Sequence, residues 1–198
     1  MTARKFTDYF LALCPALVWL TPLLICEPLS FSLSLLCSVF IHESGHIFAF
    51  FLTGAGRARL FGSFGGLLLT PTHQLSYGQE LVVAMLGPLF NLAFAFVLLV
   101  CAHIWKYDAL YLLTGVNLSC AICNLLPVFE LDGGRMLFSF CAMAFSLDTA
   151  QKIHRGVSLV ALSVMLFFSL YLVLMLDAGY RILLWVAIII LASDKNKR

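Results

Sequence analysis

Residues 31–53 read FSLSLLCSVFIHESGHIFAFFLT, an apolar run that is broken by one polar cluster, His42-Glu43-Ser44-Gly45-His46. A helix needs about 20 apolar residues to cross the hydrocarbon core of a bilayer, and this run is long enough. A charged side chain near the bilayer centre costs about 3 kcal/mol on insertion scales, so ionisable residues there face a polar interior and mark function. The run therefore predicts a membrane-spanning helix that carries a functional site.

The composition of the whole chain indicates an integral membrane protein. Of its 198 residues, 62% are hydrophobic and only 11% are charged, and the mean hydropathy is +1.01. No polar stretch is long enough to fold as a separate soluble domain; the longest candidate is roughly residues 54–80. We therefore expect one membrane-embedded domain over residues 1–198, with its core at residues 31–145.

Six apolar runs predict an all-α polytopic membrane protein with about six transmembrane helices. The runs lie at residues 9–26, 31–53, 81–105, 109–127, 157–176 and 179–192. Between the second and third runs, residues 60–71 have glycines every few positions and are too short to cross a membrane. There we expect a short membrane-associated β-hairpin or re-entrant segment, surrounded by protein or a water-filled cavity.

The fourth run should end in a broken helix. Pro127 and the adjacent Gly133 and Gly134 interrupt a segment that would otherwise continue as helix through Phe145. A break of this kind exposes backbone polar groups, so we expect the segment to face the protein interior.

Basic residues predict the orientation in the membrane. Of the 12 Lys and Arg residues, all but Lys106 and Arg181 lie at the termini or in connections that six spans place on one side. Because basic residues near span ends favour the cytoplasmic side, we expect both termini in the cytoplasm. The net charge of +2 gives no indication of nucleic-acid binding.

The seven cysteines are scattered through apolar segments and do not form the framework of a secreted disulfide domain. Most are expected to be small buried apolar residues. Cys120-x-x-Cys123 has a metal-binding spacing, but one such pair without a second is a weak signal. Three histidines outside the polar cluster, His73, His103 and His154, are interpreted as polar residues at the membrane interface.

The sequence His42-Glu43-x-x-His46 predicts a zinc site. Residues four apart lie one turn above each other on a helix, so both imidazoles can reach one ion. Catalytic zinc takes a third protein ligand and keeps a position for water, and Asp132, at the broken helix, is the best-placed candidate. Glu43 would then be the general base. The alternatives are a chance match of the motif and, for Asp132, an ordinary turn residue before Gly133.

Two motifs together resemble the signatures of the site-2 proteases, zinc metalloproteases that cut substrates within the membrane. The first is His42-Glu43-x-x-His46; the second is Asn124-Leu125-Leu126-Pro127 followed by Leu131-Asp132-Gly133-Gly134-Arg135. The resemblance covers about residues 31–145. It implies one Zn²⁺ ion per chain, bound by His42, His46 and Asp132, with Glu43 as the catalytic residue.

Two asparagines extend the resemblance, and the residues before Leu131 depart from it. Gly87-Pro88-Leu89-Phe90-Asn91 is similar to a third, weaker family signature, although helix packing explains small residues equally well. Asn124 matches an asparagine that the family places near the active site, and Asn91 could donate to an oxyanion. Relatives often have proline before the Leu-Asp-Gly sequence, whereas this chain has Phe129-Glu130. Glu130 puts a second carboxylate two residues from the proposed ligand, and we do not expect Glu130 to be a ligand.

The arrangement looks most like the branch that includes the stage IV sporulation protease, which releases a transcription factor from its membrane-tethered precursor. The resemblance implies a bacterial cell membrane, no appended soluble domains and a membrane-protein substrate, cut within or near its transmembrane segment. It is also compatible with regulation by a membrane-embedded partner. The sequence does not indicate the oligomeric state. Because a transmembrane substrate must unwind before cleavage, an exposed strand from residues 60–70 could pair with it.

A different class of function remains open. Buried His and carboxylate side chains also mark ion pathways in membranes, so the alternative is a divalent-metal transporter or a metal-sensing membrane protein. A catalytically inactive relative is disfavoured, because every expected catalytic residue type is present.

Overall fold

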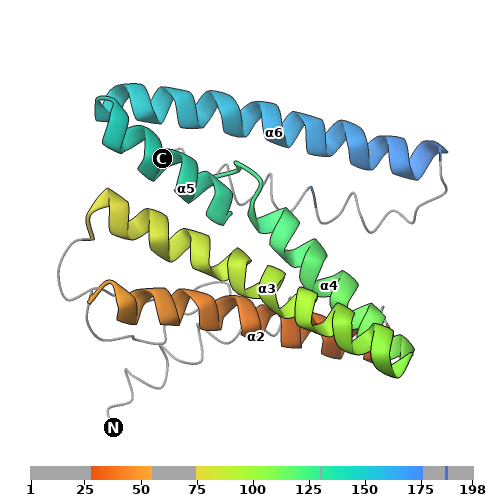
Figure 1. Cartoon of the computed structure of the whole chain (residues 1–198). Helices are drawn as coiled ribbons and strands as arrows, with labels where there is room; N and C mark the ends of the chain where they lie inside the picture. Colours follow the sequence, from red (N-terminus) through yellow and green to blue (C-terminus); the bar gives the residue numbers. More distant parts are fainter. Residues whose placement is uncertain (1–27, 55–74, 130, 176–185, 187–198) are drawn as a thin grey trace, which may run out of the picture. The chain divides into compact units, whose positions relative to one another are not determined.

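The computed structural model describes residues 28–54, 75–129, 131–175 and 186. This part of the chain is all-helical, with five α-helices and no strand (Figure 1). The helices are α2 (Leu29–Leu52), α3 (Tyr77–Trp105), α4 (Asp108–Asn124), α5 (Asp132–Ala144) and α6 (Leu147–Met175).

Three of these helices, α2, α3 and α6, are long and apolar enough to cross a membrane. They correspond to the runs predicted at residues 31–53, 81–105 and 157–176. The run at 109–127 also forms a helix, α4, but α4 has only 17 residues and ends at Asn124. The predicted spans at 9–26 and 179–192, and the hairpin or re-entrant segment at 60–71, lie outside the described residues.

Large apolar side chains cover the outer surfaces of the described helices. Phe40 of α2, Phe96 of α3 and Phe167 of α6 are each about 70% exposed, at 72%, 69% and 71%. Exposed apolar side chains in this number would be unfavourable in water and are favourable against lipid. The chain is therefore an integral membrane protein.

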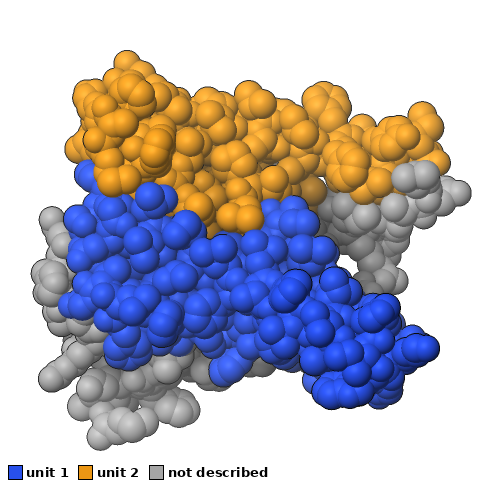
Figure 2. All heavy atoms as spheres, viewed as in Figure 1, with its two compact units in different colours: residues 1–122 blue, residues 123–198 orange. Residues whose placement is uncertain are grey.

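The described chain divides into two compact units, residues 1–122 and 123–198, which Figure 2 shows in different colours. In the first unit, α2 and α3 lie side by side (Figure 1). Ala49 and Phe50 of α2 pack against Val83 of α3 in a core that excludes solvent. This packing fixes the face of α2 that carries the polar cluster against α3.

A side-chain hydrogen bond links the end of α2 to the start of α3. Gly54, with a φ of 64°, follows α2 in the left-handed conformation that commonly ends a helix. Ser76 and Gln79 form a reciprocal capping box at the start of α3, and Gln79 Nε2 also donates to the carbonyl of Thr53. Because of this cap, α3 begins four residues before the predicted boundary at residue 81.

In the second unit, the predicted helix break is confirmed. α4 ends at Asn124 and α5 begins at Asp132, and the loop between them forms its own short hydrogen bonds. The amide of Val128 donates to the carbonyl of Leu126, and the amide of Leu131 donates to the carbonyl of Val128. α5 and α6 then pack side by side (Figure 1), so Asp132 is presented on a helix that α6 supports.

The structure differs from two expectations about the burial of side chains. His154 is buried, at 8% exposed, because the rings of Phe129 and Phe138 pack against it. His154 is therefore a core residue and not an exposed polar one, whereas His103, at the end of α3, is exposed. Most cysteines were expected to be buried, but among the five described ones only Cys141 is buried, and Cys123 is exposed.

Candidate metal centre

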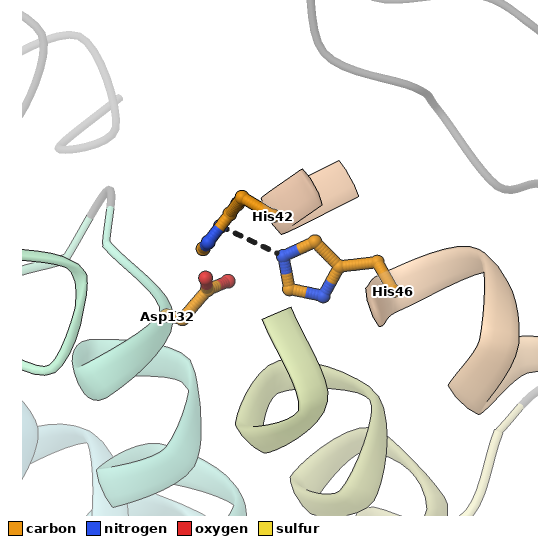
Figure 3. Close-up of side chains that lie close together, drawn as sticks. All are labelled: His42, His46 and Asp132. Atoms are coloured by element: carbon orange, nitrogen blue, oxygen red, sulfur yellow. Dashed lines mark hydrogen bonds between the residues drawn. The ribbon is translucent and has the colours of Figure 1, made fainter. Parts of the chain in front are cut away.

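His42 and His46 lie on one face of α2, with one helical turn between them. Both are buried, at 7% and 8% exposed, and their rings are nearly perpendicular, at 85°, with centroids 4.7 Å apart. The two Nε2 atoms face each other at 3.1 Å, the contact that is dashed in Figure 3. The motif therefore forms the paired-imidazole arrangement that its spacing predicts.

The separation of these nitrogens fits a zinc ion. Two nitrogens at about 2.0 Å from zinc in tetrahedral geometry lie about 3.3 Å apart. The observed Nε2 separation of 3.1 Å is close to this value. The donor set, two buried imidazoles, is also the type that zinc binds readily.

A backbone carbonyl of α3 orients His46. The Nδ1 of His46 lies 2.8 Å from the carbonyl oxygen of Val83, and because a carbonyl can only accept, Nδ1 must carry the proton. The other ring nitrogen, Nε2, is then left with its lone pair. A second hydrogen bond of this kind, which fixes the tautomer, is typical of metal-binding histidines.

Asn91 of α3 lies beside the other imidazole. Its Nδ2 is 3.5 Å from His42 Nδ1, and its Oδ1 is buried with no hydrogen-bond partner among the described residues. Because His46 Nε2 can only accept, His42 Nε2 donates to it, and His42 Nδ1 in turn accepts from Asn91 Nδ2. For both Nε2 atoms to bind one ion, the proton of His42 must move to Nδ1, and a half-turn of the Asn91 amide would let Oδ1 accept it.

Two glycines allow α2 and α3 to approach at this site. A Cβ on Gly45 would overlap the backbone of α3 at Leu86, and a Cβ on Gly87 would overlap the ring of His46. Gly87 belongs to the segment Gly87–Asn91, and the structure shows close helix packing at its first residue. This packing leaves the space beside α3 that the two imidazoles occupy.

Asp132 is the first residue of α5, in the second unit, and its side chain is also drawn in Figure 3. It is buried, at 6% exposed, and its Oδ1 accepts a long, 3.5 Å contact from Nη1 of the half-exposed Arg135. A carboxylate in the first turn of a helix is favoured by the helix dipole. The structure therefore presents Asp132 as a buried carboxylate on a helix terminus rather than as a residue of an exposed turn.

The remaining predicted site residues lie close in sequence to these. Glu43 follows His42 on α2 and is half-buried. Asn124 is the last residue of α4, at the start of the loop that leads to Asp132. Glu130 lies outside the described residues.

The contribution of Val83 has no signal in the sequence, because every residue type has a carbonyl and no side-chain pattern marks the one that His46 contacts. Gly45 was not among the predicted site residues, although it did have a signal in the sequence. Glycine within a helix costs about 1 kcal/mol relative to alanine, and its presence between two candidate ligands was a signal of close helix packing.

Comparisons with known proteins agree with the motifs. Residues 102–168, which include Asn124 and Asp132, match peptidase family M50. The chain is 33% identical over 132 residues to Stage IV sporulation protein FB of Bacillus subtilis, a match that covers 64% of this chain and 46% of that protein. It is 28% identical over 142 residues to a zinc metalloprotease of Methanocaldococcus jannaschii, with 69% and 41% covered. The chain thus spans less than half the length of these curated relatives.

The fold also has a counterpart among solved structures. The structure titled Site-2 Protease from Methanocaldococcus jannaschii superposes with a TM-score of 0.61 at 23% identity, over 92% of this chain and 86% of that one. Together, the sequence and fold matches confirm the resemblance that the two motifs predicted.

Proposed function

We propose that this chain, a relative of the site-2 proteases with a peptidase family M50 segment, is an intramembrane zinc endopeptidase. The observation that carries the proposal is the pair of buried Nε2 atoms 3.1 Å apart on an apolar helix. Two imidazoles held in this way, one of them fixed by the Val83 carbonyl, match the first half of a catalytic zinc site.

Asp132 is the proposed third ligand. It is buried, as both histidines are, and its carboxylate would complete the two-nitrogen, one-oxygen donor set of a catalytic zinc site. Bound there, one Zn²⁺ ion would activate water as the nucleophile and polarise the peptide carbonyl.

Glu43 would act as the general base. It follows His42 on α2, so its carboxylate is close to the proposed ligands without being one of them. It would accept the proton of the attacking water and deliver it to the amine of the leaving peptide. Asn91 and Asn124 would contact the substrate or the oxyanion.

The proposed substrate is a membrane-tethered protein that is cut within or near its transmembrane segment. Apolar side chains surround the described helices, so such a substrate can approach from lipid, where it must unwind to expose a peptide bond. Because Stage IV sporulation protein FB is a relative, a transcription-factor precursor is the substrate class we propose. The proposal includes cytoplasmic termini and a bacterial cell membrane.

The test is Glu43→Gln in the full chain. The amide keeps the size of the side chain but cannot accept the proton, so we expect bound zinc to stay at the wild-type level while cleavage is lost. The matched control is Glu80→Gln, the same change in the first turn of α3, which should leave cleavage intact. The readout is the accumulation of full-length membrane proteins in cells that carry each variant, followed by cleavage of the accumulated protein with purified enzyme.

Two results would contradict the proposal. One is cleavage at the wild-type rate by a zinc-loaded Glu43→Gln protein. The other is zinc flux into proteoliposomes containing the wild-type protein, with no precursor accumulating in Glu43→Gln cells, which would identify a transporter instead.

A further inference from the structure

Helix α6 directs two buried polar side chains at the segment that precedes Asp132. His154 and Ser158 lie one turn apart and so share a face of the helix. They are 8% and 0% exposed. Ser158 Oγ donates a hydrogen bond of 3.0 Å to the carbonyl of Pro127, which is 31 positions earlier in the chain.

This hydrogen bond satisfies a carbonyl that the loop itself does not pair. The carbonyls of Leu126 and Val128 accept from amides within the loop, at 2.8 and 3.0 Å. The carbonyl of Pro127 is instead paired with a side chain of another helix. A part-buried carbonyl without a donor is costly in apolar surroundings, so the hydrogen bond from Ser158 holds the loop at Pro127 against α6.

The contacts of His154 leave the first turn of α5 little freedom to move. Its ring lies 4.3 Å from that of Phe129 and 5.6 Å from that of Phe138, measured between centroids. A Cβ on Gly134 would be 3.2 Å from His154 Nε2 and would overlap the carbonyl of Val128. The start of α5 is therefore packed tightly between the loop and α6, so a shift of the loop would also move Asp132.

We propose that Ser158, with His154 packed one turn before it, is a positioning residue that fixes the carboxylate of Asp132 in its zinc-binding position. This inference rests on the proposed role of Asp132 as a ligand. Ser158 acts through the Pro127 carbonyl and the loop, and it touches neither the metal nor the substrate.

Ser158→Ala tests the inference, because it removes only the hydroxyl. In the purified full chain, zinc affinity is measured by chelator competition, and ligand geometry by the visible absorption of the cobalt(II)-substituted protein. We expect zinc affinity about tenfold lower than wild type, the smaller end of the effect of outer-shell partners, and a changed cobalt spectrum. Thermal unfolding shows whether the variant is folded.

Ser163→Ala is the matched control. Ser163 lies on the same helix, but its Oγ donates to the carbonyl of Leu159 within α6, at 2.9 Å. This variant should bind zinc as the wild type does. Equal zinc affinity and equal cobalt spectra for Ser158→Ala and Ser163→Ala would overturn the inference.

Two more substitutions separate the hydroxyl from packing. Ser158→Thr keeps the donor and should recover zinc affinity to within about threefold of wild type, and a loss as large as that of Ser158→Ala would refute a role for the hydroxyl. If Ser158→Ala does not fold, Ser158→Cys replaces it, because a thiol fills a similar space and is a weak donor. Wild-type zinc affinity in Ser158→Cys would then overturn the inference.

Asp132→Ala separates this inference from the proposed function. If the wild type binds zinc and Asp132→Ala does not, Asp132 is a ligand, and only the Ser158 result decides the positioning role. If Asp132→Ala binds zinc as tightly as wild type, the proposed ligand set itself fails, and the positioning role with it.

Discussion

Gly87 of α3 lies against the imidazole of His46 on α2, so closely that a Cβ built on Gly87 would overlap the Nε2 atom of that ring. It would also come within 3.0 Å of His42 Cε1. The backbone of α3 at Gly87 therefore lies close to the imidazoles of both His42 and His46. Their position depends on the absence of a side chain at residue 87.

Gly87→Ala should consequently impair metal binding more than it impairs folding. The atom in the way belongs to a side chain, so His46 can rotate to relieve the overlap, but its Nε2 then leaves the position that faces His42. We expect zinc affinity to fall about 10- to 100-fold, as for loss of a group that orients a ligand. Chelator competition on the purified variant measures it.

The control for this substitution is Gly115→Ala on α4, where an added Cβ would meet nothing within 4 Å. Because alanine favours helix over glycine by about 1 kcal/mol, this variant should unfold at the same temperature as wild type or slightly higher, with unchanged zinc affinity. Equal zinc binding by Gly87→Ala and Gly115→Ala would show that the contact with His46 does not set the ligand geometry.

Asn91 gives a second prediction, which separates two roles for one side chain. If its Oδ1 accepts the Nδ1 proton of His42, Asn91→Ala lowers zinc affinity by about tenfold. Asn91→Asp keeps an acceptor at the same place and should retain zinc, since a carboxylate paired with a metal-bound imidazole is a common arrangement. Metal content and zinc affinity of the two variants are the measurements.

An oxyanion role for Asn91 would give a different pattern. Asn91→Ala would then bind zinc normally and lose cleavage rate, and Asn91→Asp would lose rate as well, because a carboxylate cannot donate. Asn117→Ala is the control for removing a buried amide, since Asn117 Nδ2 donates within its own helix to Leu113. Normal zinc binding with loss of cleavage rate in both Asn91 variants would contradict the orienting role.

Much of the described fold could be predicted from hydrophobic runs alone, because lipid requires long apolar helices whose backbone groups are paired internally. α2, α3 and α6 follow from this rule. The break before α5 was also predictable, because Pro127 cannot continue a helix. Gly133 and Gly134 do not interrupt the helix as expected, because both lie in the first turn of α5. The start of α3 was placed too late, since the capping box of Ser76 and Gln79 extends the helix into polar sequence.

The first half of the candidate site was predictable for a similar reason. The spacing of His42 and His46 places both imidazoles on one helix face wherever that helix lies. The groups that orient the proposed ligands could not be predicted, because they depend on which helix faces pack against each other. The Val83 carbonyl has no sequence signature. The neighbours of His154 in sequence, Lys152 and Arg155, suggested an interfacial residue, whereas in the folded chain Phe129 and Phe138 pack against its ring.

Removal of zinc gives the third prediction. A ligand that binds only the folded protein stabilises it by RT ln(1 + [L]/Kd), which is about 2.7 kcal/mol at a hundredfold excess over Kd. We expect a zinc chelator to lower the unfolding temperature of the detergent-solubilised protein and abolish cleavage, and added Zn²⁺ to restore both. Mg²⁺ should restore neither, because it prefers six oxygen ligands. In His42→Ala and Asp132→Ala the unfolding temperature should no longer respond to zinc, and a wild-type unfolding temperature that is independent of zinc would contradict a shared metal site.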